Sequence, residues 1–407
     1  MLDVGIDQVT GGQNDAARGL GLYPDGRFVA VSSLLQSGGS NSLIVRYNLD
    51  GSRDTSFGGY GTGARIDSWG SGNDNLQACV VQPADSKLVA TGLVVGAVKN
   101  TGADGLVVRY TAAGLPDTSF GTGGRSVVFA SKEADICRDV AVQSDGKIVA
   151  VGGGDNLKGK GIVNGPKRTL VGRLLANGAL DTTFGTGGVV ALSVGSGSSE
   201  AGAVAIQANG KIVVGGDCAE GMFVLRLNLN GTLDTGFGAG GIRLVSVPGV
   251  RHVSGVGGCL RLQGDEKIVL GGSADYGPDL ATMTLVRLNP NGGFDTTFNG
   301  TGIQASEVPS TIYSLVLNPA GDIIACGAGN ENGPDGILVA RFTSSGQPDA
   351  GFNASGATPG YVFRVVGMPG GFGWSIVYRP NDDTILVGGR GFLPDYTGVL
   401  GFLRIEN

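Results

Sequence analysis

The sequence predicts an all-β fold, a seven-bladed β-propeller of four-stranded antiparallel blades, and three observations predict it. The 407 residues include 77 glycines and only 16% charged residues, which is typical of a chain with many tight turns. Short apolar runs separated by glycine-rich turns recur along the whole chain. The phrase LDTTFGTGG at 180–188 returns in variant form at intervals of about 60 residues, which indicates a repeated structural unit.

Each unit contains four expected strands. In the copy that begins near residue 200, the apolar runs are GAVAIQA from 202, KIVVGGD from 211, MFVLRLN from 222 and IRLVSV from 242. Each run is six or seven residues long and rich in Val, Ile and Leu, which is too short for a helix and typical of a strand.

A tight turn joins the first two strands of each unit. Asp-Gly and Asn-Gly pairs supply the positive φ that a short hairpin needs, so we expect these two strands to be antiparallel neighbours. The turns lie at Asp25-Gly26, Asp85-Ser86, Asp145-Gly146, Asn209-Gly210, Asp265-Glu266, Gly321-Asp322 and Asn381-Asp382.

Counting these turns gives seven units in a single domain, 1–407. The last unit lacks a fourth run, while an orphan run, GIDQVT from 5, stands at the start. We therefore expect the N-terminal strand to pair with the C-terminal blade and close the ring, because closure removes exposed sheet edges. The expected blades span about 15–68, 76–130, 135–195, 200–247, 251–307, 311–367, and 372–405 plus 4–10.

The recurring phrase lies between the third and fourth strands and carries one phenylalanine per copy. Because these rings are a whole blade apart, we expect them to fill the gaps between adjoining blades rather than to share a catalytic pocket. They are Phe57, Phe120, Phe184, Phe237, Phe298 and Phe352.

An arginine recurs in the third apolar run, eight residues before the aspartate of each phrase. An arginine within an apolar strand needs a partner, so we expect structural, bidentate pairs with these aspartates. The alternative is a ring of arginines around an anion-binding channel. No phrase follows Arg404, and Asp3 is its expected substitute partner. The arginines are Arg46, Arg109, Arg173, Arg226, Arg287, Arg341 and Arg404, and the aspartates are Asp54, Asp117, Asp181, Asp234, Asp295 and Asp349.

The unit as a whole has the pattern Q-x-D-G-K-I-V-x-x-G, then L-V-R-L-N-x-x-G, then L-D-x-x-F-G. This pattern resembles the delta-60 repeat, a propeller-forming repeat of bacterial secreted and cell-surface proteins, and the resemblance covers essentially the whole chain. It is weakest at GDIIACG and DDTILVGG in the last two copies. The resemblance implies a propeller in a secreted, periplasmic or cell-surface setting. It implies no catalytic residues.

Composition excludes several classes of partner. The formal net charge is −6 and no run rich in Lys and Arg occurs, so we expect no nucleic-acid partner and no charge-driven binding to membranes. No apolar stretch approaches the roughly 18 to 20 residues of a spanning helix, so we expect no membrane insertion. The sequence begins without a recognisable signal peptide. Five cysteines form no C-x-x-C pair, and we expect most of them to be buried thiols.

The loops of a propeller blade fall on two faces. The Asp-Gly turns and the Asp-x-x-Phe connections share one, here called the turn face. The other, here called the loop face, carries the connections between second and third strands and between consecutive blades. Insertions on the loop face differ from copy to copy, for example GDNLKGKGIVNGPKR from 154. Variable loops on a rigid scaffold are common places for binding sites, so the loop face is the predicted site.

Several loop-face residues are candidates for ligand contact. The basic residues Lys158, Lys160 and Arg168 could bind an acidic polymer, or simply be solvated. Aromatic residues could stack on sugar rings or anchor a protein, with blade packing as the alternative. These are Trp69, Tyr276, Trp374, Phe392 and Tyr396, and the single histidine, His252, joins the set.

Nothing in the sequence marks a catalytic centre. One histidine cannot build a multi-histidine metal site, and no G-x-S-x-G elbow or D-x-D-x-D-G loop occurs. We expect no catalytic residue, cofactor or regular metal site, and leave an irregular calcium site open. The favoured function is a non-catalytic binding or scaffold propeller that recognises a glycan or protein, as a monomer or as part of a larger surface protein. The alternative is a polymer-acting lyase or hydrolase with its site over the ring axis on the same face.

Overall fold

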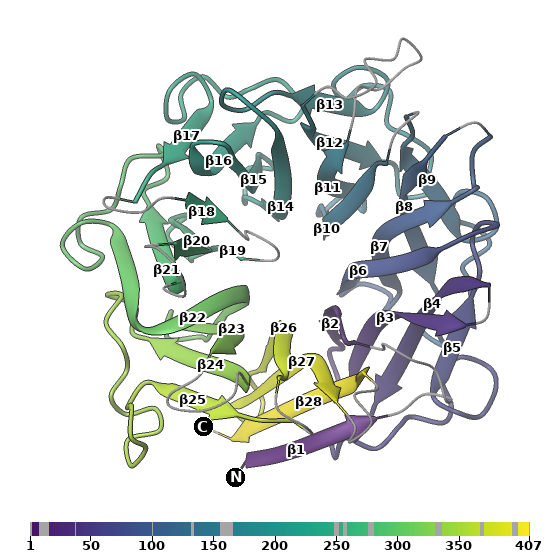
Figure 1. The fold of residues 1–407 in the computed structure, drawn as a ribbon. Coiled ribbons are helices and arrows are strands. Elements are labelled where there is room, and N and C mark those ends of the chain that lie inside the picture. The colour runs from purple at the N-terminus through teal and green to yellow at the C-terminus, as the bar shows by residue number, and fades with distance from the viewer. Residues whose placement is uncertain are drawn as a thin grey trace.

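Antiparallel sheets are arranged radially around a central axis in the computed structural model of the chain (Figure 1). The structure describes residues 2–7, 16–36, 38–99, 101–131, 134–154, 166–247, 252–254, 259–275, 281–329, 336–366, 370–392 and 398–406. Strands β2, β6, β10, β14 and β26 lie nearest the centre of the ring in Figure 1, and the strands that follow them in the pairing order of each four-stranded sheet lie farther out.

Five sheets are four-stranded blades. The first holds β2 (Gly19–Leu22), β3 (Phe28–Gln36), β4 (Gly39–Tyr47) and β5 (Ala64–Asp67). The second holds β6 (Asp74–Val81), β7 (Leu88–Val95), β8 (Ala103–Tyr110) and β9 (Arg125–Phe129). The third holds β10 (Ile136–Val142), β11 (Ile148–Gly154), β12 (Arg168–Leu174) and β13 (Val189–Leu192). The fourth holds β14 (Ser199–Ile206), β15 (Ile212–Cys218), β16 (Gly221–Leu227) and β17 (Ile242–Val245).

The remaining four-stranded blade joins the two ends of the chain. Its order is β1 (Leu2–Asp7), β28 (Gly398–Glu406), β27 (Thr384–Phe392) and β26 (Phe372–Arg379). Strand β1 pairs antiparallel with β28, with Leu2 opposite Ile405 and Asp7 opposite Leu400. In this register the backbone of Asp3 lies opposite that of Arg404.

The prediction of seven separate blades is wrong, because the sixth sheet is an eight-stranded one. Its strands are β18 (His252–Ser254), β19 (Leu260–Leu262), β20 (Ile268–Asp275), β21 (Ala281–Leu288), β22 (Ile303–Leu317), β23 (Ile323–Gly329), β24 (Gly336–Phe342) and β25 (Tyr361–Arg364).

Strand β22 is what unites this sheet. It is 15 residues long and pairs with β21 through its first part and with β23 through its last part. The expected boundary between 307 and 311 falls inside it. Residues 303–317 contain no glycine, whereas the link from β5 to β6 contains Gly70 and Gly72 and the link from β13 to β14 contains Gly195 and Gly197. The chain stays extended from one part of the sheet to the next, and glycine content alone does not explain this, because residues 130–135 between β9 and β10 also lack glycine.

The middle strands of the blades are buried on both faces, which explains their near-continuous apolar sequences. All seven residues of β11, β16 and β23 are buried, because each sheet packs between two others. The hairpin that leads into such a strand needs a positive φ. Gly26 has φ +86°, and at the same place in the second blade Ser86 takes φ +56° at a steric cost.

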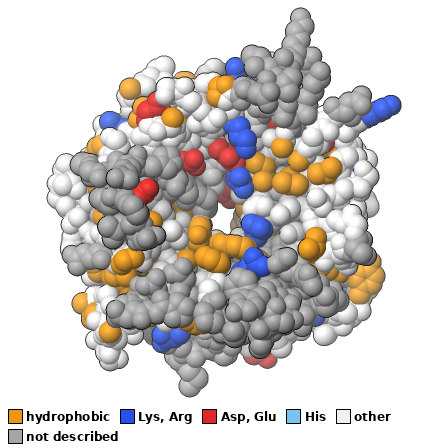
Figure 2. Space-filling model, viewed as in Figure 1, with side chains coloured by type: hydrophobic (Ala, Val, Ile, Leu, Met, Phe, Trp, Pro, Cys, Tyr) orange, Lys and Arg blue, Asp and Glu red, His pale blue; other side chains and the backbone are white. Residues whose placement is uncertain are grey.

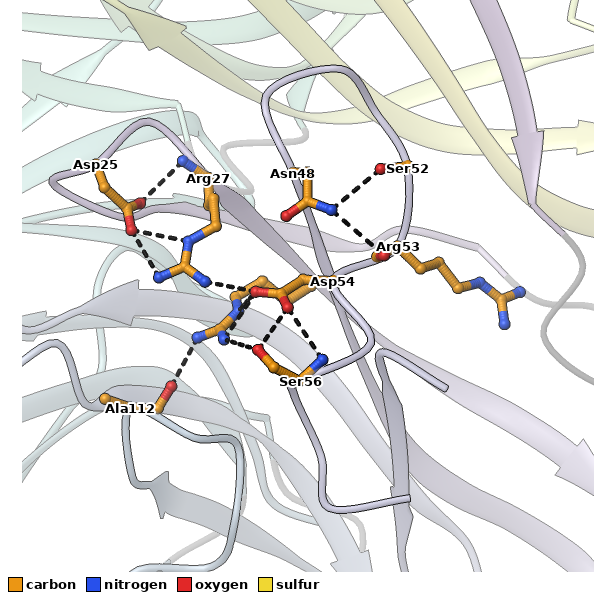
Figure 3. Close-up of polar contacts among 9 residues, drawn as sticks. Asp25, Arg27, Asn48, Ser52, Arg53, Asp54, Ser56 and Ala112 are labelled. Carbon is orange, nitrogen blue, oxygen red and sulfur yellow. Dashed lines mark hydrogen bonds and ion pairs between the residues drawn. The ribbon is translucent and has the colours of Figure 1, made fainter. Parts of the chain in front are cut away.

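The recurring phrase interlocks neighbouring blades through the arginine of the third strand. In the first blade, Arg46 Nε donates to Asp54 Oδ2 at 2.8 Å, and Arg46 Nη1 donates to the carbonyl of Ala112 in the next blade at 2.6 Å. The guanidinium also lies over the ring of Phe57, 4.4 Å from its centroid. Figure 3 shows this centre, in which Arg27 reaches Asp54 from the Asp-Gly turn.

The same arrangement recurs around the ring. Arginine Nε lies 2.6 to 2.9 Å from aspartate Oδ2 in the pairs Arg109–Asp117, Arg173–Asp181, Arg226–Asp234, Arg287–Asp295 and Arg341–Asp349. The rings of Phe120, Phe184, Phe237, Phe298 and Phe352 lie 4.5 to 4.9 Å from the matching guanidinium carbons. The phrase is therefore scaffold, and these arginines point into the joints between blades.

Neither the cysteines nor the hydropathy of the described residues points to a particular function. Cys137, Cys218, Cys259 and Cys326 are buried, Cys79 is half-buried, and none of the five is part of a disulfide. Burial raises the pKa of the Cys137 thiol to about 12, so it stays protonated and inert. Within the described residues, no helix has the length and hydropathy needed to cross a membrane.

Candidate functional site

A cavity of about 730 Å³ lies at the centre of the ring and is lined by the innermost strands. Figure 2 shows Lys and Arg side chains along one side of the central opening, with acidic side chains and a hydrophobic patch close by. A cavity of this size falls in the range of sites for small ligands.

A β-bulge at one register position shapes the cavity wall. In β6, β10, β14, β22 and β26 the pairing with the next strand shifts by one residue, leaving one residue of the inner strand unpaired. Bulges re-aim side chains and are common beside functional sites. The unpaired residues are Gln77, Arg138, Gly202, Tyr313 and Trp374, and all of them line the cavity.

Arg18 occupies the corresponding place just before β2, and its guanidinium carbon lies 4.7 Å from the centroid of a Trp374 ring. Burial, reinforced by the positive charges of Arg138 and Arg390, lowers the pKa of Arg18. No carboxylate among the described residues forms an ion pair with this guanidinium. A partly buried cation close to other cations favours the arrival of an anion.

Trp374 orients this arginine. Its ring stacks with that of Phe372, with 6.3 Å between centroids and 13° between planes, while Arg18 lies over it. A cation over an indole ring in this way is held by electrostatic attraction to the ring face.

Acidic groups lie on another part of the wall. Arg138 Nε lies 2.5 Å from Glu200 Oε1, and this pair is partly solvent-exposed. Glu200 is also the direct neighbour of Asp217 across the β14–β15 ladder. The wall thus offers carboxylate oxygens that can accept hydrogen bonds from the hydroxyl groups of a ligand.

Asp139 follows the bulge of β10 and lines the cavity. Burial raises the pKa of Asp139, although the Val204 N–H and the charge of Arg261 favour the ionised form. Its Oδ2 accepts the N–H of Val204 and its Oδ1 accepts that of Val140, both at 2.9 Å. A carboxyl group of raised pKa in a cavity is suited to proton transfer.

Of the predicted residues whose side chains the structure describes, only Trp374 lines this cavity. Trp69 is 7% exposed and packs edge to face against Tyr110 in the core, with 5.9 Å between centroids. Arg168 begins β12 away from the cavity lining. His252 and Phe392 have described backbones in β18 and β27, but their side chains lie outside the described residues, as do Lys158, Lys160, Tyr276 and Tyr396.

Sequence reasoning missed Arg18, Arg138, Arg261, Asp139 and Tyr313, although the repeat contained a signal for three of them. Arg18, Arg138 and Tyr313 each stand five residues before the residue that opens the hairpin turn, as does Trp374. Aligning the repeats on that residue would have shown large or charged side chains at a place where another copy has glycine. No signal of this kind marks Arg261 or Asp139.

Among the described residues, no group of three or more His, Cys, Asp or Glu side chains is arranged to hold a metal ion. The described cavity instead combines guanidinium groups with carboxylate and phenol oxygens, which is the chemistry of anion and hydroxyl recognition.

Comparison with protein families finds one match. Residues 24–57, 143–184, 207–237, 263–298 and 320–352 match a β-propeller family described as a domain of unknown function, DUF5122. Each matched segment ends at the phenylalanine of a phrase, so the family repeat contains the turn, the arginine and the aspartate described above. Among curated proteins, none matches the chain.

Solved structures are similar to this chain at low sequence identity, and those with TM-scores above 0.5 share its fold. A protein of unknown function from Dyadobacter fermentans DSM 18053 has a TM-score of 0.52 and 11% identity, over 100% of this chain and 99% of that one. An ulvan lyase, a polysaccharide lyase with -[GlcA(1-4)Rha3S]- bound, has a TM-score of 0.51 and 10% identity, over 96% and 94%. A glucose dehydrogenase has a TM-score of 0.45 and 15% identity, over 83% and 98%. The fold and the family match together identify the chain as a β-propeller whose repeats are similar to those of the DUF5122 family.

Proposed function

We propose that this protein is a binding propeller that holds an acidic carbohydrate at the loop-face end of its axial cavity. The observation that carries the proposal is Arg18. Its guanidinium is partly buried, held over Trp374, close to Arg138 and Arg390, and without a carboxylate partner among the described residues. A carboxylate or sulfate group would relieve the repulsion between these cations and form charge-assisted hydrogen bonds.

The rest of the cavity favours a carbohydrate over a simple anion. Glu200 and Asp217 lie near the cations and can accept hydrogen bonds from hydroxyl groups, while Tyr313 supplies a phenol on another part of the wall. The cavity volume of about 730 Å³ suits a few sugar units. The ulvan lyase that shares the fold acts on a polymer of this class, but its likeness carries only the fold, so the ligand class rests on the cavity itself.

Titration calorimetry tests this proposal. An oligomer of glucuronate should bind the wild-type protein, an oligomer of glucose of equal length should bind at least tenfold more weakly, and added salt should weaken the glucuronate complex. Arg18→Gln should reduce glucuronate affinity at least tenfold. Arg168→Gln, the same change on the loop face but off the cavity lining, should leave it unaltered. Equal binding by wild type and Arg18→Gln would sink the proposal.

A second candidate is a lyase that cleaves the same kind of polymer, and the state of Asp139 favours it. A base in the cavity would take the proton from the carbon next to a uronate carboxylate, the glycosidic C–O bond would break, and the leaving oxygen would take up a proton. Asp139, whose pKa is raised by burial, is the candidate base, and an arginine beside the uronate carboxylate would stabilise the charge that develops.

One measurement separates the two candidates. The ultraviolet absorbance of an unsaturated product should grow with time for a lyase and stay flat for a binding protein, although both bind the polymer. For a lyase, Asp139→Asn should abolish the absorbance while calorimetry still detects binding. A fold check by circular dichroism is needed, because Asp139 also accepts two backbone N–H groups.

The proposal extends to the resemblance to the delta-60 repeat and to the cellular location of the protein. We place the protein outside the bacterial cytoplasm, secreted, periplasmic or on the cell surface, which is the setting implied by its resemblance to the delta-60 repeat. Acidic polysaccharides are accessible there. Fractionation of the native cells with an antibody against the protein tests this, and a signal confined to the cytoplasm would contradict it.

A further inference from the structure

A second cavity, of about 340 Å³, lies where the blade containing both chain ends meets the first blade. We call it the seam pocket. Its lining includes Phe28, Tyr47, Leu49, Gly51, Phe402 and Arg404. This joint differs from the others because, within the described residues, no Asp-x-x-Phe phrase meets Arg404.

Phenylalanine fills the equivalent space at the joints that have a phrase. The glycine in the turn after the third strand of the next blade shows whether this space is filled, because a Cβ added to that glycine would point into it. A Cβ added to Gly114 would lie 2.5 Å from the ring of Phe57, and one added to Gly346 would lie 2.7 Å from that of Phe298. Corresponding distances of 2.9 to 3.1 Å hold for Gly178, Gly231 and Gly292 against the rings of Phe120, Phe184 and Phe237. At Gly51 an added Cβ would meet nothing within 4 Å, so the aromatic plug is missing there.

Arg404 also differs from its counterparts. Its Nε is buried and makes no hydrogen bond within the described part of the structure, whereas the Nε of Arg46 donates to Asp54 at 2.8 Å. The Nη2 of Arg404 lies 3.0 Å from Glu406 Oε1, in a pair whose side chains are 31% and 44% exposed. Such an exposed pair is weak and leaves the guanidinium open to another carboxylate.

The other polar groups of the seam pocket are already engaged. Asp7 accepts hydrogen bonds from the Tyr47 hydroxyl at 2.7 Å and from Arg53 Nε at 2.8 Å, so its charge is balanced. Arg379 Nη1 donates to the carbonyl of Leu49 at 3.4 Å and thereby takes over the backbone link between these two blades. What remains unfilled is a place for one carboxylate and one aromatic ring.

We propose that the seam pocket docks a segment of another polypeptide in which an acidic residue stands three positions before a phenylalanine. The acidic side chain pairs with the exposed part of the Arg404 guanidinium, and the ring lies over the same guanidinium against Gly51. The chain itself supplies the template, because Asp181 and Phe184 make these contacts with Arg173 at 2.9 Å and 4.5 Å. This site is independent of the axial cavity and of the ligand proposed for it.

Fluorescence anisotropy with the full chain tests the proposal. The probe is a labelled peptide with blocked ends and the sequence LDTTFGTGG of residues 180–188. It should bind saturably. Peptides with the aspartate replaced by asparagine, or the phenylalanine by alanine, should each bind at least tenfold more weakly, because each removes one of the two contacts. Peptide variants leave the protein unchanged, so their comparison does not depend on any mutant folding.

Protein variants locate the site. Arg404→Gln should weaken peptide binding at least tenfold, and Arg404→Lys should weaken it less, because lysine keeps the charge but lacks the planar fork. Arg364→Gln, an outer-strand change outside the seam pocket, is the matched control and should bind as wild type does. Equal binding of all three peptides, or no saturation up to about 1 mM wild-type protein, would overturn the proposal.

Discussion

The guanidinium of Arg173 lies over the ring of Phe184, with 4.5 Å between Arg173 Cζ and the ring centroid. Nε of the same arginine donates to Asp181 at 2.9 Å, and Nη1 donates to the carbonyl of Leu229 in the next blade. One buried side chain therefore joins the phrase of its own blade to the following blade. Because two blades depend on it, changes at this centre should weaken the ring and not only a loop.

Phe184→Ala should lower the free energy of unfolding by about 3 to 5 kcal/mol, because a fully buried ring is lost and a cavity remains between the blades. Urea denaturation followed by circular dichroism measures the change. Leu229→Ala nearby, at a side chain that is 56% exposed, should alter stability by less than about 0.5 kcal/mol. A Phe184→Ala protein as stable as the Leu229→Ala control would show that the ring is not a structural plug.

Low pH should weaken the arginine–aspartate pairs at the joints between blades, because it protonates their aspartates. Burial opposes ionisation of Asp181, but the hydroxyl and N–H of Thr183 outweigh it, together with Arg173 and Lys147, and lower its pKa to about 2. The stability that this carboxylate contributes is complete above its unfolded pKa of about 3.9 and is lost as the pH falls through about 2.

Asp181→Asn should therefore cost most stability at neutral pH, and the gap to wild type should narrow as the pH falls from about 4 to about 2. Urea midpoints measured across that range test the effect. Asp145→Asn, which removes a carboxylate that is 54% exposed, serves as the control and should show a smaller gap. A gap that stays constant down to about pH 2 would contradict the lowered pKa.

Ser86→Gly should stabilise the protein by up to about 1 kcal/mol. Ser86 has φ +56°, a region that costs a residue with a Cβ roughly 1 to 2 kcal/mol, and the flexibility of glycine in the unfolded chain offsets part of the gain. The reverse change at the matched turn, Gly26→Ala, should destabilise, because its Cβ would also lie 2.7 Å from Leu49 Cδ2. Thermal melts of both variants test whether Ser86→Gly raises the melting temperature and Gly26→Ala lowers it.

Removal of β1 should destabilise the ring and promote association. Without residues 2–7, the edge of β28 is unpaired and Arg53 and the Tyr47 hydroxyl lose Asp7, so we expect a loss of about 2 kcal/mol or more. Urea denaturation gives the loss, and gel filtration detects edge-to-edge association. Asp7→Asn in the full chain separates the side-chain contribution from that of the ladder. Unchanged stability after the deletion would mean that the β1–β28 pairing contributes little.

Local features of the repeat were open to prediction because they depend on residues close in the chain. The hairpin turns could be predicted because Gly26 and its counterparts readily adopt a positive φ. The pairing of Arg173 with Asp181 could be predicted because only the end of one strand and one turn separate the two residues. The prediction of separate blades failed at β22, where one unbroken strand serves two parts of a sheet. Apolar runs alone cannot show whether a chain bends between them.

By itself the sequence determined the all-β repeat, the turns and the arginine–aspartate scaffold, since each arises from contacts within one unit or between adjacent units. Only the tertiary structure decided the candidate site. Arg18, Arg138 and Trp374 belong to three different blades, and closure of the ring brings them to one cavity. The seam pocket likewise exists only because the first blade and the last meet. Distance along the chain carries no information about such contacts, because ring closure places residues hundreds of positions apart side by side.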